Sequence, residues 1–433
     1  MLFQNIYCTF VRELRKHMNG IRKITVILTA LFLSAMSGLG QTPVTEEIPA
    51  TLKELGFEDI RTELRYDTLY ASIEDRAYRG TFRGAAAAIQ MIAEGHPEIQ
   101  QFEIVLTDYK MPQLIVHASK REGIWDVRVD REMKQALKML KTVKPQAASM
   151  GKIDISFIPM ISLVNNKLDH LFDYSVRIAP AIAATLWKGS RLTIQPIFPI
   201  INNLGVDDTK RYIQIGNASL RQQIISNKHW LLTATAGFFN PERVGVNAQV
   251  GFHAIRGLDF YLHAGYTLQA NYTHQNGFGF TRNSGKLDFM AKADYYERHT
   301  KLQIELQGGR FLYGDYGARL DVTRHFSEYA IGIYGILTGG EHNFGFHFAI
   351  PMGGKRQKRT WFIRPRLPEY FNLEYSMETN PQKKYYGERM GEYYTTQPDQ
   401  NRSAHFWEPD FVQEYVQRIL NGTFKEEHQT KHF

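Results

Sequence analysis

The sequence predicts a mainly β protein: a transmembrane antiparallel β-barrel of about twelve strands, with a small α+β domain before it and a polar tail with a short helix after it. Three observations support this prediction. Apolar and polar residues alternate from residue 152 to 351, an apolar run follows a basic pair near the start, and aromatic residues make up 13% of the 433 residues. A mean hydropathy of -0.36 argues against a helical membrane bundle.

Residues 1–40 predict a cleaved secretory signal peptide. Ile24–Met36 is an apolar run that Arg22 and Lys23 precede, and small residues follow it. The run is shorter than the roughly 20 residues that span a bilayer. We expect cleavage after Gly40. A start at Met18 would give a signal of ordinary length, and the true start codon stays open. An uncleaved anchor helix is the alternative.

Cleavage would change the charge and the cysteine content of the chain. Residues 1–40 hold five of the 52 Lys and Arg and one of the 44 Asp and Glu, so the net charge falls from +8 to +4. The remaining chain has no basic stripe to follow phosphates, which argues against nucleic acid as a partner. Cys8, the single cysteine, would also be lost. A cysteine-free exported chain suits the bacterial periplasm or outer membrane, and we expect the outer membrane of a Gram-negative bacterium.

Residues 41–150 predict a small α+β periplasmic domain. We find no nucleophile–base constellation in it, and we expect Asp59, Glu74 and Asp75 on solvated faces. Strands are expected after the turn at Leu55–Ile60 and over Thr68–Asp75, Ile99–Leu106 and Gln113–Ala118, and helices over Thr81–Glu94 and Asp130–Lys144.

Residues 151–354 predict the barrel. The segments 244–253, 258–265, 287–294 and 302–307 alternate with period two, which places one set of side chains on each face of a strand. Charged residues on the polar face argue against the dry core of a soluble β-sandwich, the alternative fold. Twelve strands are expected to start near Ile153, Tyr174, Leu192, Tyr212, Trp230, Val244, Leu258, Leu287, Leu302, Ala318, Ile331 and Phe344.

The run Gly309–Phe326 (GRFLYGDYGARLDVTRHF) resembles the YjbH-like family, outer-membrane proteins of exopolysaccharide and capsule export of which some members are called GfcD. The family pattern is G-R-F/Y-L-x-G-D-x-G followed by a strand that ends in R-x-F. Further similar segments are Leu55–Ile60, Glu74–Arg79, Gly332–Thr338, Phe346–Pro351 and Trp361–Arg366.

The motif and the alternation supply the candidate site residues. Gly309, Gly314, Asp315 and Gly317 are expected to form a tight hairpin turn. The polar face is expected to line the lumen, either as an ion-pair network that stiffens the barrel or as a ladder of polysaccharide contacts. These residues are Tyr261, His263, Gln303, Glu305, Arg310, Arg319, Asp321 and Arg324.

Residues 355–433 predict a polar tail. A basic cluster, 355–359, is interpreted as a solvated charge run, with lipid phosphates as the alternative partner. Residues 367–405 are polar and rich in tyrosine, with little periodicity. An amphipathic helix is expected near 409–421, either packed on the periplasmic domain or docked on a partner.

The resemblance implies a non-enzymatic outer-membrane barrel that assists exopolysaccharide or capsule export, as a polar conduit or a scaffold. Its partners would be outer-membrane lipid, polysaccharide and proteins of the export machinery, and no cofactor or metal site is expected. The oligomeric state stays open. Two alternatives remain: a barrel that anchors a secretion or gliding apparatus, and a lipid-modifying enzyme using His325 with Ser327 or His253 with Ser226.

Overall fold

The computed structural model describes residues 44–78, 82–164, 173–203, 212–240, 242–273, 277–281, 283–352, 356, 362–376, 391–398 and 406–423. The expected signal peptide and its cleavage site lie outside these residues, as does most of the basic cluster 355–359. Contacts divide the chain into Met1–Glu47 and Ile48–Phe433, and both sheets belong to the second unit. None of the described helices is long and apolar enough to cross a membrane.

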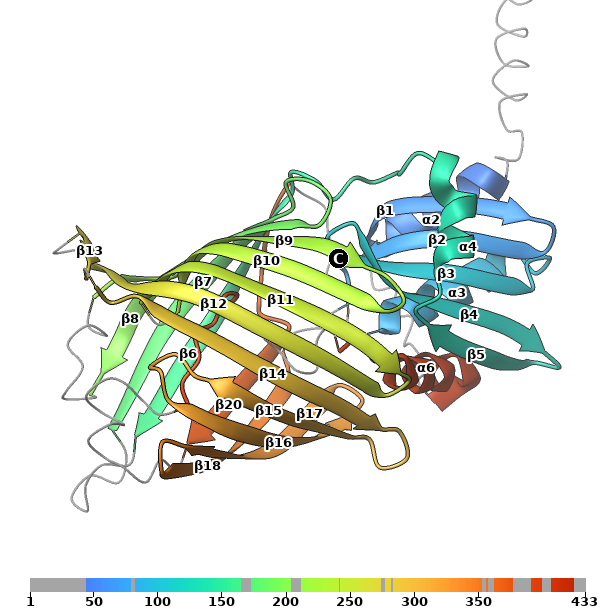
Figure 1. Cartoon of the computed structure of the whole chain (residues 1–433). Helices are drawn as coiled ribbons and strands as arrows, with labels where there is room; N and C mark the ends of the chain where they lie inside the picture. Colours follow the sequence, from blue (N-terminus) through green and yellow to red (C-terminus); the bar gives the residue numbers. More distant parts are fainter. Residues whose placement is uncertain are drawn as a thin grey trace, which may run out of the picture. The chain divides into compact units, whose positions relative to one another are not determined.

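A five-stranded sheet forms the small α+β part (Figure 1). Strands β2 and β3 are parallel and are connected through α3, whereas the other neighbours are antiparallel. Helix α2 and strand β5 were not predicted, and α4 is shorter than expected. The elements are α2 (Val44–Leu55), β1 (Phe57–Arg65), β2 (Thr68–Asp75), α3 (Arg83–Gly95), β3 (Gln101–Asp108), β4 (Met111–Arg121), β5 (Ile124–Asp130), α4 (Lys134–Met139) and the 3-10 turn η1 (Leu140–Thr142).

All twelve strands predicted for residues 151–354 occur, each within a few residues of its expected start, and each pairs antiparallel with the next. A short extra strand, β13 (Gly277–Phe280), pairs with the end of β12. The twelve are β6 (Ile153–Val164), β7 (Asp173–Ala184), β8 (Ser190–Asn202), β9 (Gln214–Ser226), β10 (Trp230–Phe239), β11 (Arg243–Ile255), β12 (Leu258–Thr273), β14 (Lys286–Glu297), β15 (Leu302–Arg310), β16 (Tyr316–Phe326), β17 (Tyr329–Thr338) and β18 (Glu341–Pro351).

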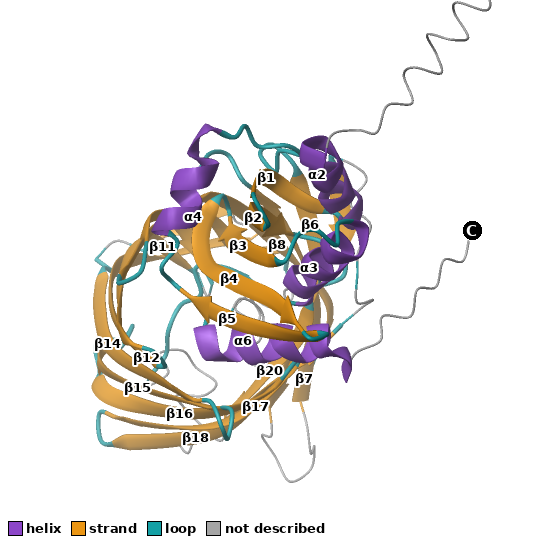
Figure 2. Ribbon diagram, turned by 90° about the vertical axis from the view of Figure 1, so that its right-hand side faces the viewer, coloured by secondary structure: helices purple, strands orange, loops and turns teal. Residues whose placement is uncertain are grey.

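One stretch of the tail lines both edges of this large sheet. Strand β19 (Ile363–Arg366) pairs parallel with β6, and β20 (Tyr370–Ser376) pairs antiparallel with β18. The sheet is strongly curled (Figure 2). Within the described residues the strand order begins at β19 and ends at β20, so the pairing itself does not close a ring.

The two faces of the large sheet have inverted polarity. In β17, Ile331 and Ile333 are exposed, whereas Ala330 and Tyr334, which alternate with them, are buried. We call the buried face of the large sheet the interior face. In a water-soluble sheet the buried face is the apolar one. Here the interior face carries buried polar side chains from strand after strand, among them Ser175, Thr193, Asn217, Ser219, Thr267, Asp288, Asp321, Thr323 and His325.

The expected C-terminal helix is present as α6 (Pro409–Arg418). Glu408 caps its N-terminus by accepting a hydrogen bond from the backbone N–H of Asp410. The buried Phe411 and Tyr415 rings pack against Phe82, which precedes α3. Gln413 and Asn421 provide hydrogen bonds to the open edge of β5, so the helix covers a strand edge that would otherwise be exposed.

A histidine cluster in the small sheet predicts pH-dependent stability. His117 Nδ1 lies 2.9 Å from Glu103 Oε1, and Nε2 lies 3.5 Å from Asp130 Oδ2. Burial lowers the pKa of His117, but the hydrogen bonds to Asp130 and Glu103 outweigh it and raise the pKa from 6.5 to about 9. The stabilising contribution is therefore complete below pH 6.5 and is lost as the pH rises through about 9.

We expect His117→Gln to lower the unfolding temperature at pH 6 and to have little effect above pH 10, as measured by thermal unfolding of both proteins. The matched control is His299→Gln, which replaces an exposed histidine in the turn after β14. A destabilisation by His117→Gln that stays constant across this pH range would contradict the assignment.

Candidate functional site

Three of the predicted interior residues form one charged cluster. Lys292 Nζ lies 2.6 Å from Glu305 Oε1 and 4.7 Å from the centre of the Tyr261 ring. Gln303 donates from Nε2 to both carboxylate oxygens of Asp294, at 3.0 Å. Acids, base and aromatic ring thus come together from β12, β14 and β15 as a paired network.

Arg319 and Asp321 form a second cluster on β16. Arg319 Nη2 lies 3.0 Å from Asp321 Oδ2, its Nη1 lies 3.2 Å from Glu374 of β20, and its guanidinium stacks over the Tyr334 ring at 4.0 Å. The other oxygen of Asp321 lies 2.9 Å from His347 Nε2. This cluster connects β16 across the sheet to β20.

The structure places Arg324 and Arg310 away from these clusters. Arg324 is exposed and alternates with the interior residues of β16, so the expectation that it lines the lumen is wrong. A one-residue step along a strand moves a side chain to the opposite face. Arg310 pairs across strands with Phe289 and Tyr316, both exposed on the outer face.

The family motif forms the turn between β15 and β16. Gly314 has φ +94°, as expected for a tight turn, whereas Gly317 is needed for a different reason: a β-carbon there would lie 2.2 Å from the carbonyl oxygen of Leu337. Gly309 lies one residue before the end of β15 and pairs with Gly317 of β16. Asp315 Oδ2 accepts hydrogen bonds from Thr338 Oγ1 and from the backbone N–H of Gly391, at 2.5 and 2.8 Å. The motif turn therefore holds the tail.

Residues 391–398 of the tyrosine-rich tail run along the interior face, which the sequence did not predict. We call residues 391–398 the interior segment. From the motif turn it passes Leu312 and Asn240, and it reaches Arg191 near the start of β8. These partners lie in the β15–β16 turn, just after β10 and in β8, which are far apart in the strand order, so the sheet curls around the segment. Tyrosine pairs in an aperiodic stretch were the only sequence signal for it.

His263 lies beside this segment. Its Nε2 is 2.8 Å from Asp288 Oδ2, and the same carboxylate oxygen accepts a hydrogen bond from the hydroxyl of Tyr394 at 3.2 Å. Asn247 Nδ2 contacts both groups, at 3.1 and 3.2 Å. Of the eight candidate lumen residues, six thus lie on the interior face, in three separate groups.

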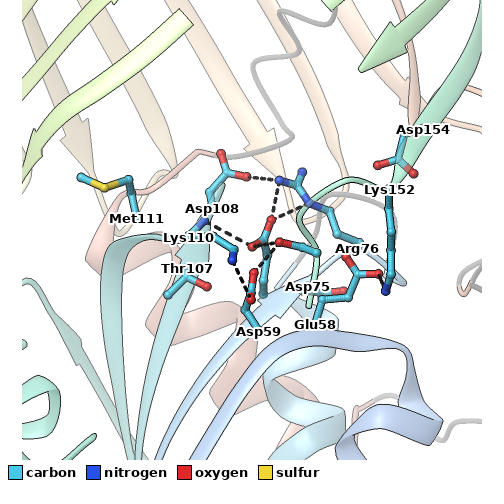
Figure 3. A network of polar contacts seen from close by, with 12 residues as sticks. Glu58, Asp59, Asp75, Arg76, Thr107, Asp108, Lys110, Met111, Lys152 and Asp154 are labelled. Carbon is cyan, nitrogen blue, oxygen red and sulfur yellow. Dashed lines mark hydrogen bonds and ion pairs between the residues drawn. The ribbon is translucent and has the colours of Figure 1, made fainter. Parts of the chain in front are cut away.

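A buried ionic network ties the small sheet to one end of the large sheet (Figure 3). Glu58 of β1 receives Lys152 Nζ at 2.7 Å and Arg364 Nη1 at 2.5 Å, and Arg364 also pairs with Asp154 of β6 at 2.9 Å. Next to these, Arg76 pairs with Glu74 at 2.7 Å and with Asp108 at 3.0 Å. The network therefore joins both sheets.

The expectation that Asp59 and Glu74 lie on solvated faces is wrong, because both are buried in this network. Asp59 pairs with Lys110 at 3.2 Å, and Ser149 donates to both Asp59 and Glu74. Burial raises the pKa of Glu74, and the nearby charge of Arg76 counteracts part of this rise. Lys110 and Ser149 lie far from Asp59 and Glu74 in the sequence, whereas Arg76 is two residues from Glu74, so the local sequence shows the Glu74–Arg76 pair but not its burial.

Tyr109, in the turn between β3 and β4, reaches the end of the large sheet. Its ring lies between two guanidinium groups, Arg76 at 4.1 Å and Arg191 of β8 at 5.1 Å. Its backbone carbonyl accepts a hydrogen bond from Gly189. Burial raises the pKa of Tyr109, which keeps its hydroxyl neutral.

The histidines considered for catalysis have other neighbours. His325 Nε2 lies 2.9 Å from Gln303 Oε1 and its ring stacks on Phe406, while Ser327 accepts a hydrogen bond from Arg418. His253 pairs with Asp259 at 2.9 Å, and Ser226 donates to the carbonyl of Pro112. In the part of the chain that the structure describes, no three His, Cys, Asp or Glu are grouped as metal ligands.

The network at the junction predicts a large difference between two acidic residues of β1. Glu58→Ala removes the buried carboxylate that pairs with Lys152 and Arg364, so both cations lose this partner. We therefore expect the free energy of unfolding to fall by about 3 kcal/mol. Glu63→Ala removes a solvent-exposed pair with Arg65 and should cost less than about 1 kcal/mol. Urea unfolding of both variants measures the difference, and equal losses would refute the role of Glu58.

Comparison with known proteins supports the resemblance seen in the motif. A family model described as exopolysaccharide biosynthesis protein YbjH (YjbH) matches residues 36–352. Searches of curated proteins and of solved structures gave no match. The matched range includes the small sheet and the thirteen strands β6 to β18, and it ends before β19, the interior segment and α6. The chain therefore belongs to the YjbH family of exopolysaccharide biosynthesis proteins.

Proposed function

We propose that this protein is an outer-membrane β-barrel of a Gram-negative bacterium that assists exopolysaccharide export or assembly without catalysing a reaction. The inverted polarity of the large sheet carries this proposal. Side chains such as Phe260, Leu262, Ile333 and Leu337 are exposed on its outer face, while charges are paired on its interior face. An outer apolar band around a polar interior is the pattern of a membrane barrel, since lipid replaces water outside.

The tail supports closure of the barrel. The stretch 363–376 pairs with β6 at its start and with β18 at its end, so one piece of chain spans the gap between the outermost of the twelve strands. In a sheet that spans the membrane, the backbone N–H and C=O groups of the edge strands need partners within the protein, because lipid supplies no hydrogen bonds. We infer that this stretch closes the barrel in the membrane.

The lengths of the strand connections support an orientation. The turns that face the small sheet and α6 are all short, at 185–189, 227–229, 256–257, 298–301 and 327–328. Of the six connections at the opposite end, three are longer, at 165–172, 203–213 and 274–285, and three are short, at 240–242, 311–315 and 339–340. Outer-membrane barrels have short periplasmic turns and longer outer loops. The proposal therefore places the small sheet and α6 in the periplasm.

The occupied interior favours a docking scaffold over a permanently open conduit. The interior segment lies among strands from β8 to β17, and paired charges fill the face around it. We propose that export proteins dock on the periplasmic part, and that polysaccharide enters the interior only when the segment moves aside.

Deletion of the gene tests the proposed function. We expect a strain that lacks the protein to lose most of its surface exopolysaccharide, and the full-length gene to restore it, as measured by carbohydrate assay of the cell surface. Unchanged surface polysaccharide would refute the proposal. Co-purification with secretion or gliding components would then favour the anchoring alternative.

A matched pair of isoleucines tests the membrane assignment. Ile333 in the middle of β17 is 65% exposed and Ile124 of the small sheet is 66% exposed. Arginine facing lipid at the bilayer midplane costs about 2–4 kcal/mol, whereas a charge facing water costs little. We expect Ile333→Arg, but not Ile124→Arg, to reduce the heat-modifiable band in outer-membrane fractions on gels with and without boiling. Equal assembly of both variants would contradict a lipid-facing β17.

A further inference from the structure

The Tyr394 side chain fills a slot on the interior face. It is 8% exposed, and its ring lies parallel to that of the fully buried Phe239, at 5.2 Å and 10°. Asn247 donates to its hydroxyl oxygen, and the hydroxyl donates to Asp288. We call Phe239, Asn247, His263, Gly265 and Asp288 the Tyr394 slot.

Gly265 of β12 makes room for the ring. A β-carbon at this position would lie 1.8 Å from the hydroxyl oxygen of Tyr394 and 3.0 Å from Asp288 Oδ1. The neighbouring interior positions of β12 carry His263 and Thr267, so the wall has a gap just where the hydroxyl enters. The slot is thus a preformed recess in the sheet and does not depend on a particular rotamer.

The chemistry of the slot matches a six-membered ring that bears hydroxyl groups. An aromatic platform offers a flat apolar surface, while an amide and a carboxylate at the rim donate and accept hydrogen bonds. Asp288 is 1% exposed, and its Oδ1 has no hydrogen-bond partner within the described residues. A pyranose supplies one flat apolar face and several hydroxyls, so it uses the same groups as the tyrosine ring and can also satisfy this oxygen.

The segment that carries Tyr394 is attached mainly through side chains. The backbone hydrogen bonds that join it to the large sheet in the described structure are those between Glu392 and Leu312 and between Thr395 and Asn240. Side-chain contacts from Asp315, Ser219 and Arg191 add to them. Each of these hydrogen bonds can be replaced by a hydrogen bond to water at a small net cost in free energy, so the segment can leave without unfolding the sheet.

We propose that the Tyr394 slot is a binding site for one sugar ring of a polysaccharide, and that Tyr394 occupies the site until a polysaccharide displaces it. The proposal rests on the function proposed above and adds to it the place and the chemistry of recognition. The interior segment is then an internal competitor, and removing its ring raises the affinity for the sugar.

The first experiment empties the slot. The full chain is purified in detergent and titrated calorimetrically with oligosaccharides prepared by partial hydrolysis of the exopolysaccharide of the same strain. We expect Tyr394→Ala to bind at least about tenfold more tightly than the unchanged protein. Tyr316→Ala, which removes a tyrosine 63% exposed on the outer face, should bind like the unchanged protein. Equal binding by Tyr394→Ala and Tyr316→Ala overturns the proposal.

A refilled slot checks that the recess itself is the site. Adding Gly265→Val to Tyr394→Ala places a side chain where the phenol was, and we expect the gained affinity to disappear. Tight binding retained by this double variant also overturns the proposal. A heat-modifiable band for each variant shows that the fold persists.

A second experiment leaves Tyr394 in place and locks the segment. Asn240 and Thr395 face each other as a hydrogen-bonded antiparallel pair, a geometry within reach of a disulfide. With Asn240→Cys and Thr395→Cys, the oxidised protein should not bind the oligosaccharides and the reduced protein should. Equal binding in both states means that the segment does not compete, and it overturns the proposal even if Tyr394→Ala does not fold.

The two proposals fail in different ways. If the deletion strain loses its exopolysaccharide but Tyr394→Ala binds no better than the unchanged protein, the function stands and the slot assignment is wrong. If the deletion strain keeps its exopolysaccharide, the proposed function is wrong whatever the titrations give.

Discussion

A sheet that turns its polar face inward has to pair every charge that it buries, and the rest of this structure follows from that constraint. An unpaired buried charge costs several kcal/mol, on the order of the whole stability of a domain. The interior charges accordingly come as sets: Lys292 with Glu305, and Arg319 with Asp321 and Glu374. The same constraint holds at the junction, where Glu58 receives two cations from distant parts of the chain. Pairing thus joins neighbouring and distant strands of the large sheet and connects it to the small one.

The tail also supplies partners for charges and strand edges of the two sheets. It lies beyond the range that the family model matches, yet it supplies β19 and β20 at the sheet edges, Glu374 for Arg319, and the ring that fills the Tyr394 slot. Helix α6 then covers the edge of β5 with the side chains of Gln413 and Asn421. The C-terminal part of the chain thus provides hydrogen-bond partners for backbone groups at the strand edges that the strands alone would leave without partners.

The strands were predictable from the sequence because period-two alternation reports the two faces of a strand directly. The same rule places Arg324 with Leu320 on the outer face, because the two lie an even number of residues apart and alternate with the buried Asp321 and His325. The interior segment and the burial of Asp59 and Glu74 were not predictable in this way. Asn247 lies 147 residues from Tyr394, and Ser149 lies 90 residues from Asp59 and 75 from Glu74, whereas the alternation of a single strand reports only its own two faces. Helix α2, which was not predicted, contains Pro49, a residue that usually disfavours the interior of a helix.

The pairing of the interior charges bears on what the interior would recognise. Charges that are already neutralised by neighbours a few ångströms away exert little net field on a passing polymer. Recognition would then depend on hydroxyl hydrogen bonds and on aromatic faces, such as Phe239 under Tyr394 and Tyr261 beside Lys292. These groups suit a hydroxyl-rich chain whatever its charge, and they hold Tyr394 by the same contacts. A polysaccharide would therefore compete with the tail on equal chemical terms, and its many repeating rings would give it the advantage of local concentration.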